Sequence, residues 1–375
     1  MIFTLALRNL FHDRMRLIVT IVGILFSIVL VAIQLGLYSG ASRMIVSMIE
    51  RADADLWIAA YKTSSFEESG VLTGRERYAA LSTPGVVSAV PMVASFSRWK
   101  KKNGGKQLCV IIGTDPAEGG LAPWNIVAGD LATIRLPDAV AVDRTYFKTL
   151  DVNGLGDTGE INGTRVRVKA LTHGIRSFTT NPYIFTTLDR ARSLLNIPPD
   201  GASYYLINVA DGADIAKVQA DLQRRLPDVE ILTQAEFSAR SLARWLFGTG
   251  AGIALIGGTL LGSLVGTVIV AQTLYSSTKD HLNEFATLRA LGSSSGYIHK
   301  VILTQAALSA ILGYALGMAI ALPVIVMSQN SALPIIMTPI LAAGLFALTV
   351  FMCAISAIAA IMKVTRIDPA MVFAR

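Results

Sequence analysis

Residues Leu274–Ile298, with the sequence LYSSTKDHLNEFATLRALGSSSGYI, decide the fold, because they form a charged segment between two long apolar ones. Ser277 with Asp280 is typical of a capping box, and Gly292 is placed to end the helix. Four polar residues fall at i, i+3, i+4 and i+7 and share one helical face: Asp280, Asn283, Glu284 and Thr287. A loop between membrane spans needs such defined structure only where something docks, so we expect a soluble partner to bind this helix.

Apolar stretches long enough to cross a membrane account for much of the chain. Hydrophobic residues make up 53% of the 375 residues, and the mean hydropathy of +0.53 is too high for an ordinary soluble protein. A span needs about 20 apolar residues. The predicted spans, none of which contains Asp, Glu, Lys, Arg or His, are 17–38, 245–274, 301–327 and 334–362. We expect the first span to be retained, because it lacks the small-residue cleavage site of a signal peptide.

The distribution of charge predicts the orientation of these spans. The segments 1–16, 275–300 and 363–375 together hold nine Lys and Arg residues but only four Asp and Glu residues. By the positive-inside rule, both termini and the 275–300 loop are cytoplasmic, and residues 39–244 lie on the other side. The net charge of +7 is therefore mostly a matter of topology, and we expect no nucleic-acid partner. Residues 1–16 are also predicted to contain an amphipathic helix in the cytoplasmic interface.

Residues 39–244 are predicted to fold as a mixed α/β domain with a β-rich insert in its middle. Asn103-Gly104-Gly105 is typical of a hairpin turn and makes the basic run around it a solvated loop tip. Strands are expected near 54–61, 86–100, 106–113, 164–170, 183–187, 204–209 and 229–232, and helices near 75–81, 188–195 and 213–226. Cys109 in this domain and Cys353 in the fourth span are too far apart in topology to form a disulfide.

Glycines recur every fourth residue in the second span, at Gly258, Gly262 and Gly266. This spacing brings two helix backbones close together, because no Cβ intervenes. Packing within the chain and a homodimer seam are both open interpretations, of which we favour the seam. The uncharged run from Trp245 is longer than a bilayer needs, so we expect it to project outward as a stalk continuous with the outer domain.

Catalytic and nucleotide-binding motifs are absent from the sequence. It contains no GxxxxGK[ST], no HExxH and no zinc-type cluster of Cys and His. Spans without Asp, Glu, Lys, Arg or His also argue against a proton- or ion-coupled carrier. We therefore expect no enzyme activity and no cofactor in this chain alone.

The whole chain resembles the MacB/FtsX superfamily of ABC transporter permeases, the type VII or mechanotransmission class. One span, a large outer domain and three further spans give its layout, and the matching motifs are ALRNLFHDRMRLIVTIVGILFSIVLV, EFATLRALGSSSGYI and RIDPAMVFAR. The similarity is closest to DevC-like permeases, on the motifs LVAIQLGLYSGASRMI, ADADLWIAA and GIRSFTTNPYIFTTLDRAR. The implied fold is four transmembrane helices with a MacB-like periplasmic core domain.

The resemblance implies a permease subunit in the bacterial inner membrane that pairs as a homodimer with two copies of a separate ABC ATPase, which binds ATP and Mg²⁺. Its movement would expel a lipidic or amphiphilic substrate through a periplasmic membrane-fusion adaptor and a TolC-type outer-membrane channel. The residues implied to contact the ATPase are Asp280, Asn283, Glu284, Phe285, Leu288, Arg289, Leu291 and Gly292.

Other branches of the superfamily give alternative functions. An FtsX-like relay signals to cell-wall hydrolases and transports nothing, and a LolC-like permease releases lipoproteins. An HrtB-like permease exports haem, for which Tyr38, Met44 and Met48 near the outer mouth are candidate ligands.

Overall fold

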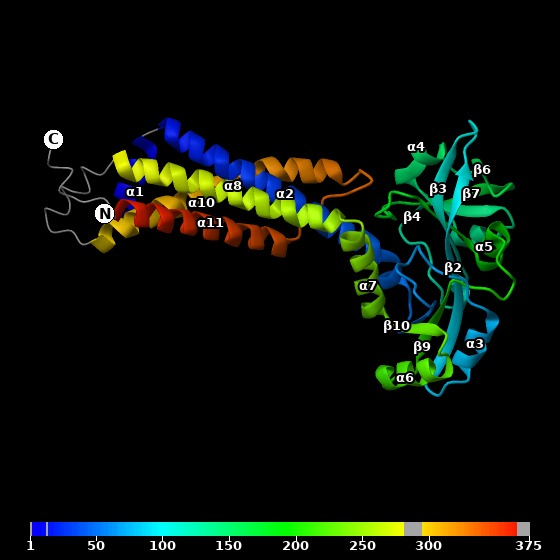
Figure 1. The fold of residues 1–375 in the computed structure, drawn as a ribbon. Helices are drawn as coiled ribbons and strands as arrows, with labels where there is room; N and C mark the ends of the chain where they lie inside the picture. Colours follow the sequence, from blue (N-terminus) through cyan, green and yellow to red (C-terminus); the bar gives the residue numbers. More distant parts are fainter. Residues whose placement is uncertain (1, 13, 281–294, 366–375) are drawn as a thin grey trace, which may run out of the picture. The chain divides into compact units, whose positions relative to one another are not determined.

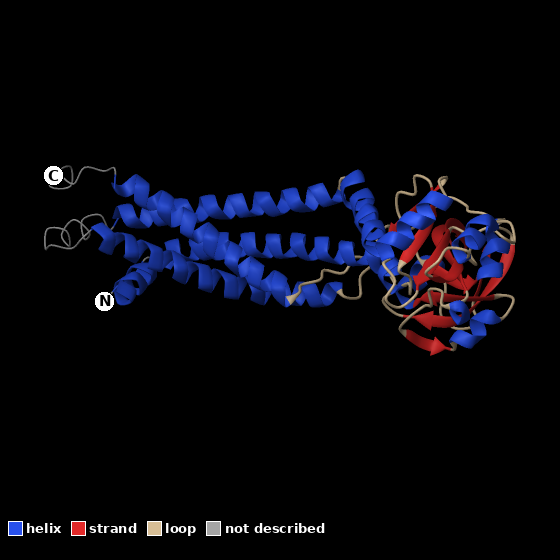
Figure 2. Cartoon of the chain, turned by 90° about the horizontal axis from the view of Figure 1, so that it is seen from below, coloured by secondary structure: helices blue, strands red, loops and turns tan. Residues whose placement is uncertain are grey.

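The computed structural model describes residues 2–12, 14–280 and 295–365. These residues form two compact units (Figure 1). We call them the helical unit (Met1–Gly40, Ile253–Gln329 and Pro334–Arg375) and the sheet unit (Ala41–Gly252 and Asn330–Leu333). Strands occur only in the sheet unit among the described residues (Figure 2).

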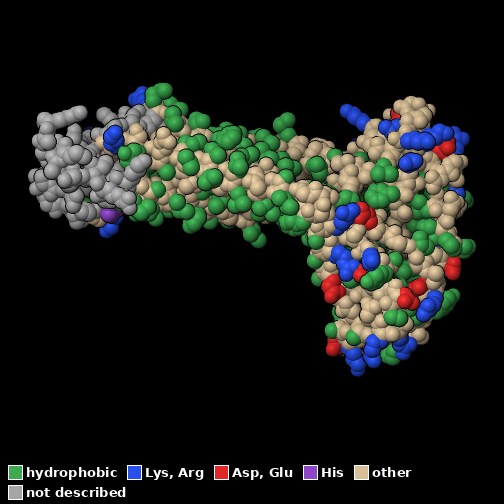
Figure 3. All heavy atoms as spheres, in the orientation of Figure 1, with side chains coloured by type: hydrophobic (Ala, Val, Ile, Leu, Met, Phe, Trp, Pro, Cys, Tyr) green, Lys and Arg blue, Asp and Glu red, His purple; other side chains and the backbone are tan. Residues whose placement is uncertain are grey.

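Long apolar helices make up the helical unit. They are α1 (Ile2–His12), α2 (Arg14–Arg51), α8 (Ala251–Asp280), α10 (Ser295–Ser328) and α11 (Pro339–Thr365). Among the described residues, four stretches are long and apolar enough to cross a membrane: Leu17–Arg51, Ala251–Ser276, His299–Ser328 and Pro339–Met362. Hydrophobic side chains cover most of the visible surface of this unit (Figure 3), as expected of helices that face lipid. The predicted four-span fold class is confirmed.

The bundle is packed through small residues on α10 that face branched residues on α2. A Cβ at Gly317 would lie 2.8 Å from Cγ2 of Ile28, and Gly313 is similarly covered by Ile24. The Ser356 hydroxyl of α11 donates to the backbone carbonyl of Thr267 in α8 at 2.8 Å. Close backbone approach and interhelical hydrogen bonds are the usual means of holding helices together in lipid.

The sheet unit is built on a ten-stranded sheet, all of whose strands lie in the described part of the chain. The strand order is β10-β1-β9-β2-β3-β8-β5-β7-β4, and β6 pairs with β2 and β7. The strands are β1 (Leu56–Ala60), β2 (Val86–Lys100), β3 (Lys106–Thr114), β4 (Ile126–Gly129), β5 (Ala139–Asp143), β6 (Thr158–Ile161), β7 (Thr164–Thr172), β8 (Tyr183–Thr187), β9 (Tyr204–Val209) and β10 (Val229–Thr233).

The strand β2 divides the sheet into two lobes. Its first half, Val86–Met92, pairs with β9, and its second half, Val93–Lys100, pairs with β3. We call β1, β9, β10 and the first half of β2 the first lobe, and the remaining strands the second lobe. The β-rich insert that the sequence predicts in the middle of the domain lies within the second lobe.

Each lobe is covered by helices because its strands carry apolar residues on the covered faces. The helices of the sheet unit are α3 (Gly74–Leu81), α4 (Phe147–Leu150), α5 (Leu188–Leu195), α6 (Ile215–Arg225) and α7 (Gln234–Leu242). In the first lobe, Val218 and Leu222 of α6 share a core with Ile58 of β1. The opposite core joins Trp57 to Met48 and Phe237, so the last turns of α2 belong to this domain.

Two boundaries differ from those predicted from the sequence. The first span is predicted to end at Tyr38, but α2 continues unbroken to Arg51. A stalk continuous with the second span is predicted from Trp245, whereas the structure has a short π-helix at Ala243–Gly248, a break at Gly250 and then α8. The helix that continues from a span into the sheet unit is therefore α2 and not α8. The chain before α8 is interrupted at Gly250, whose positive φ of 78° no regular α-helix contains.

Candidate functional site

Most of the ATPase-coupling residues predicted from the sequence lie outside the described residues. They are Asn283, Glu284, Phe285, Leu288, Arg289, Leu291 and Gly292. Asp280 is the last residue of α8, so the described helix leads directly into the predicted coupling segment. The docking of an ATPase there stays a prediction.

The recurrent glycines of α8 face α2 of the same chain. A Cβ at Gly258 would lie 2.5 Å from Nε2 of Gln34, and one at Gly262 would lie 3.0 Å from Cδ2 of Leu30. A Cβ at Gly266 would collide with the Ser27 hydroxyl and would lie 2.6 Å from Cε of Met352. This arrangement corresponds to packing within the chain, the first of the two interpretations of the glycine spacing. A second copy of the chain could reach the three glycines only by displacing α2.

The opposite face of α8 is open and apolar. Space around Gly257 is free, since no atom lies within 4 Å of the position its Cβ would take. The large side chains on this open face, with exposed fractions from 54% to 66%, are Ile253, Leu260, Leu261, Leu264 and Val268. Lipid or another membrane helix must cover such a face in the cell.

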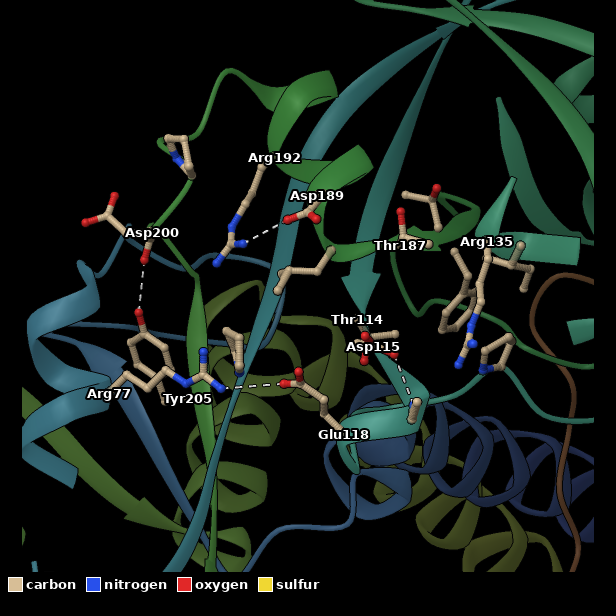
Figure 4. A pocket seen from close by; sticks show the side chains of 18 of the residues that line it. Arg77, Thr114, Asp115, Glu118, Arg135, Thr187, Asp189, Arg192, Asp200 and Tyr205 are labelled. Carbon is tan, nitrogen blue, oxygen red and sulfur yellow. Dashed lines mark hydrogen bonds and ion pairs between the residues drawn. The ribbon is translucent and has the colours of Figure 1, made fainter. Parts of the chain in front are cut away.

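A groove of about 1140 Å³ opens in the sheet unit, between residues of both lobes. It lies where the parallel strands β3 and β8 end, beside the first turn of α5 and beside α3 (Figure 4). Ligands commonly bind at the carboxyl ends of parallel strands, so its chemistry decides whether it is a binding site.

The charged side chains of this groove are largely paired with each other. Arg77 lies 3.5 Å from Glu118, and Arg192 lies 3.1 Å from Asp189 (Figure 4). The Tyr205 hydroxyl donates to backbone carbonyls, that of Thr73 at 2.6 Å among them. In the described part of the chain, no group of three or more His, Cys, Asp or Glu side chains could hold a metal ion. The groove is thus chiefly a polar seam between the lobes.

A second polar site joins the π-helix Ala243–Gly248, which follows α7, to the loop of residues 61–72 in the sheet unit. Glu67 of this loop is only 3% exposed, and both its carboxylate oxygens accept hydrogen bonds. The Tyr183 hydroxyl of β8 donates to Oε1 at 2.6 Å, and Nε1 of Trp245 in the π-helix donates to Oε2 at 3.0 Å. Burial raises the pKa of the Glu67 carboxyl above its usual value, although both donors oppose that shift.

The neighbouring carboxylate, Glu68, holds the same helix from its exposed side. Arg244 donates from Nε and Nη2 to the two oxygens of Glu68 at 2.8 and 2.9 Å. This two-pronged geometry is the strongest form of arginine–carboxylate pair. The Arg244 guanidinium accordingly holds the pKa of the Glu68 carboxyl below its usual value. One turn earlier, Arg240 pairs with Glu230 and donates to the backbone carbonyl of Thr63 at 3.2 Å.

Of these residues, the sequence pattern points only to Trp245, as the start of a long uncharged run. Glu67 and Glu68 are separated from Arg244 and Trp245 by 176 to 178 positions, so only the fold brings them together. An acidic pair in a loop is usually a solvated surface feature. The one local signal is an Arg-Trp pair directly before a long uncharged run, which is also typical of a membrane interface.

Two family models together match most of the chain. A MacB-like periplasmic core domain matches residues 17–225, and an FtsX-like permease C-terminal domain matches residues 245–369. The chain belongs to the MacB/FtsX family of ABC transporter permeases. Permeases of this family pair with an ATPase and form dimers.

Proteins similar to this MacB/FtsX permease include curated permeases and solved extracytoplasmic domains. In two strains of Mycobacterium tuberculosis, an uncharacterized ABC transporter permease is 24% identical over 378 residues, which cover 98% of this chain and 98% of the relative. The periplasmic region of MacB from Actinobacillus actinomycetemcomitans covers 52% of this chain and 94% of its own, with 12% identity and a TM-score of 0.38. The extracellular domain of the transporter YknZ from Gram-positive bacteria covers 48% and 99%, with 9% identity and a TM-score of 0.36.

Proposed function

We propose that this chain is the permease of an ABC exporter in which a separate ATPase, which binds ATP and Mg²⁺, moves the extracytoplasmic sheet unit. Two copies of the chain would work with two copies of the ATPase. The cargo would be lipidic or amphiphilic and would leave through a periplasmic adaptor and an outer-membrane channel. Both termini and residues 281–294 would lie in the cytoplasm of a bacterial cell, and the sheet unit would be periplasmic.

The observation that carries this proposal is the continuity of α2. This single helix contains a candidate membrane span and ends among the core residues of the sheet unit. Met48 and Ile49 on its last turns are fully buried with Trp57 and Phe237. A shift of α2 in the membrane must therefore move the domain core, because well-packed interiors transmit displacement instead of absorbing it.

The membrane helices support movement of the outer domain over passage through a central pore. The four predicted spans contain no Asp, Glu, Lys, Arg or His, and a polar pathway through lipid would need such groups or a polar stripe. Hydroxyl groups in α8 instead donate hydrogen bonds to backbone carbonyls of the preceding turn, as Thr259 does to the carbonyl of Leu255 at 3.0 Å.

Export of haem is disfavoured by the positions of its candidate ligands. Met48 is fully buried in the core of the sheet unit, and Met44 is only 6% exposed. The Met48 thioether could reach a haem only if that core opened, and of the three candidate ligands only Tyr38 is partly exposed.

Co-purification from native membranes tests the proposal. The full-length chain is solubilised in detergent and captured, and mass spectrometry identifies the proteins that accompany it. We expect an ABC ATPase together with a membrane-fusion adaptor. An ATPase with a cell-wall hydrolase and no adaptor would favour the FtsX-like relay, and the absence of any ATPase would contradict the proposal.

Charge reversal tests the coupling segment within the same experiment. Glu284→Lys with Arg289→Glu should reduce recovery of the ATPase by about tenfold, because interfaces lose most when a buried charge loses its partner. Ser293→Ala, beyond the predicted end of the coupling helix, is the matched control and should recover as much ATPase as the unaltered chain. Full recovery with the double reversal would show that the ATPase docks elsewhere.

A further inference from the structure

The connection between α7 and α8, residues 243–250, is an irregular segment that we call the hinge. The π-helix Ala243–Gly248 is followed by Thr249 and by Gly250, whose φ of 78° a side chain would strain. Nothing lies within 4 Å of the position that a Cβ of Gly250 would take. Because the helix is interrupted here, the side chains that fix Ala243–Gly248 decide how a movement of α8 is passed to this part of the sheet unit.

Glu67 is the side chain that connects the hinge to the second lobe. Its carboxylate accepts from Trp245, five residues before Gly250, and from Tyr183 in the strand β8. The strand β8 pairs with β3 and β5, so it lies inside the second lobe. Phe178, just before β8, also packs on Trp245 with ring centroids 6.2 Å apart.

Glu68 fixes the same turn against rotation. Its two hydrogen bonds with Arg244 define both the distance and the direction of that side chain. The Ser64 hydroxyl holds the carboxylate in place from within the loop at 2.5 Å. Arg244 also lies over the Trp245 ring at 5.8 Å, so the two contacts of the turn support each other.

We propose that Glu67 and Glu68 are positioning residues that pass the movement of α8 to the second lobe, by holding Trp245 and Arg244 against the 61–72 loop at the hinge. This inference rests on the proposed function, since it assigns a point at which ATP-driven movement enters that lobe. The joint complements α2, whose last turns enter a core shared by both lobes through apolar packing.

The chemistry of the joint explains why carboxylates occupy it. A buried carboxylate is costly, and apolar residues of similar size often replace buried ion pairs without loss of stability. Apolar packing would, however, allow the Trp245 ring to slide, whereas hydrogen bonds to two oxygens fix its position. A joint that must transmit the direction of a movement therefore benefits from hydrogen bonds that the stability of the fold alone would not require.

Hydrogen exchange in the assembled transporter tests this assignment. The full chain with its co-purified ATPase is placed in lipid nanodiscs, and exchange of residues 62–72 and 178–187 is compared with and without ATP. The variants are Glu68→Arg, Glu67→Gln, Trp245→Phe and the swap of Glu68→Arg with Arg244→Glu. The matched control is Asp138→Arg, which breaks the Asp138–Arg167 pair of 3.0 Å, whose side chains are 43% and 44% exposed, elsewhere in the second lobe.

In the unaltered complex, we expect ATP to change the exchange of both segments. Glu68→Arg and Trp245→Phe should reduce that change about fivefold or more, the lower end of the coupling between sites in proteins, while ATP hydrolysis stays close to normal. The swap should restore the change, and Asp138→Arg should leave it intact. Restoration by the swap separates a positioning role from a loss of folding. Glu67→Gln serves the same purpose, because this variant keeps the size of the side chain.

Three results would overturn the assignment. The ATP-dependent change could persist in both Glu68→Arg and Trp245→Phe, or it could fall equally in Asp138→Arg. It could also be absent from an unaltered complex that hydrolyses ATP, which would refute this joint while leaving the ATPase partnership intact. A chain that brings down no ATPase would instead refute the proposed function, and the joint with it.

Discussion

At the residue scale, Glu67 is the more deeply buried of the two carboxylates of the joint. Burial raises its pKa above the usual 4.5, so the folded chain binds its proton more tightly than the unfolded chain does. The stability that this proton confers is complete below pH 4.5 and is lost as pH rises through the raised pKa. We expect Glu67→Gln, neutral at every pH, to lose less thermal stability than the unaltered chain as pH rises above 4.5.

The matched control for this pH dependence is Glu236, whose shift has the opposite sign. The backbone N–H of Thr233 and the side chain of Gln219 hold the pKa of Glu236 below 4.5. Its contribution to stability is present above pH 4.5 and is lost as pH falls through the lowered pKa. Glu236→Gln should therefore flatten the acidic side of the profile. The account of Glu67 would be contradicted if the unfolding midpoints of Glu67→Gln and of the unaltered chain depended on pH in the same way.

Gly159 gives a second prediction at this scale. Trp99 is fully buried, donates from Nε1 to the Leu150 carbonyl at 3.0 Å, and lies where a Cβ of Gly159 would be. Gly159→Ala forces the indole out of position and should destabilise the sheet unit by about 1–3 kcal/mol. Gly154→Ala, which meets no atom within 4 Å, is the control in the same thermal unfolding series. Equal midpoints for the two variants would show that the indole moves freely.

At the element scale, the glycines of α8 separate packing within the chain from self-association. Gly266→Leu pushes against Ser27 and Met352 and should lower the unfolding midpoint of the bundle, at a cost of roughly 1–3 kcal/mol. Gly257→Leu, on the open face of the same helix, should leave the midpoint unchanged. Thermal unfolding and cross-linking in detergent are measured together for both variants.

Cross-linking also decides where the second copy packs. Loss of the dimer in Gly257→Leu alone would place the seam on the open face of α8. A Gly266→Leu chain with an unchanged midpoint but no dimer would contradict the packing seen here and return the glycines to the seam.

The elements show how far local sequence patterns reach. The strands β2 and β3 follow the predicted hairpin because Gly104 takes the positive φ of the turn, at 85°. The continuation of α2 to Arg51 could not be predicted, because its outer residues are buried by strands that are distant in sequence. The break at Gly250 was also missed, since glycines are common in membrane helices and only the fold shows which of them bends the chain.

At the scale of the whole molecule, composition and the lengths of the apolar stretches were sufficient to predict the four candidate spans, because lipid imposes strict rules on length and polarity. The sheet unit was predicted as mixed α/β with a β-rich insert, but not the strand order that divides it into two lobes. Its lobes are joined by one long strand, β2, and strand pairing over such distances has no local signature. The joint at Glu67 and Glu68 was invisible in the sequence for the same reason.

The most direct test of ATP-driven movement is a distance between the two copies of the sheet unit. Tyr78→Cys places a spin label on a residue that is 73% exposed, while the native Cys109 and Cys353 are buried and stay unlabelled. Double electron–electron resonance spectroscopy then measures the distance between the two spin labels in the complex with its ATPase. We predict that the distance distribution shifts when ATP replaces the nucleotide-free state. A complex that hydrolyses ATP with an unchanged distribution would contradict the claim that the ATPase moves this domain.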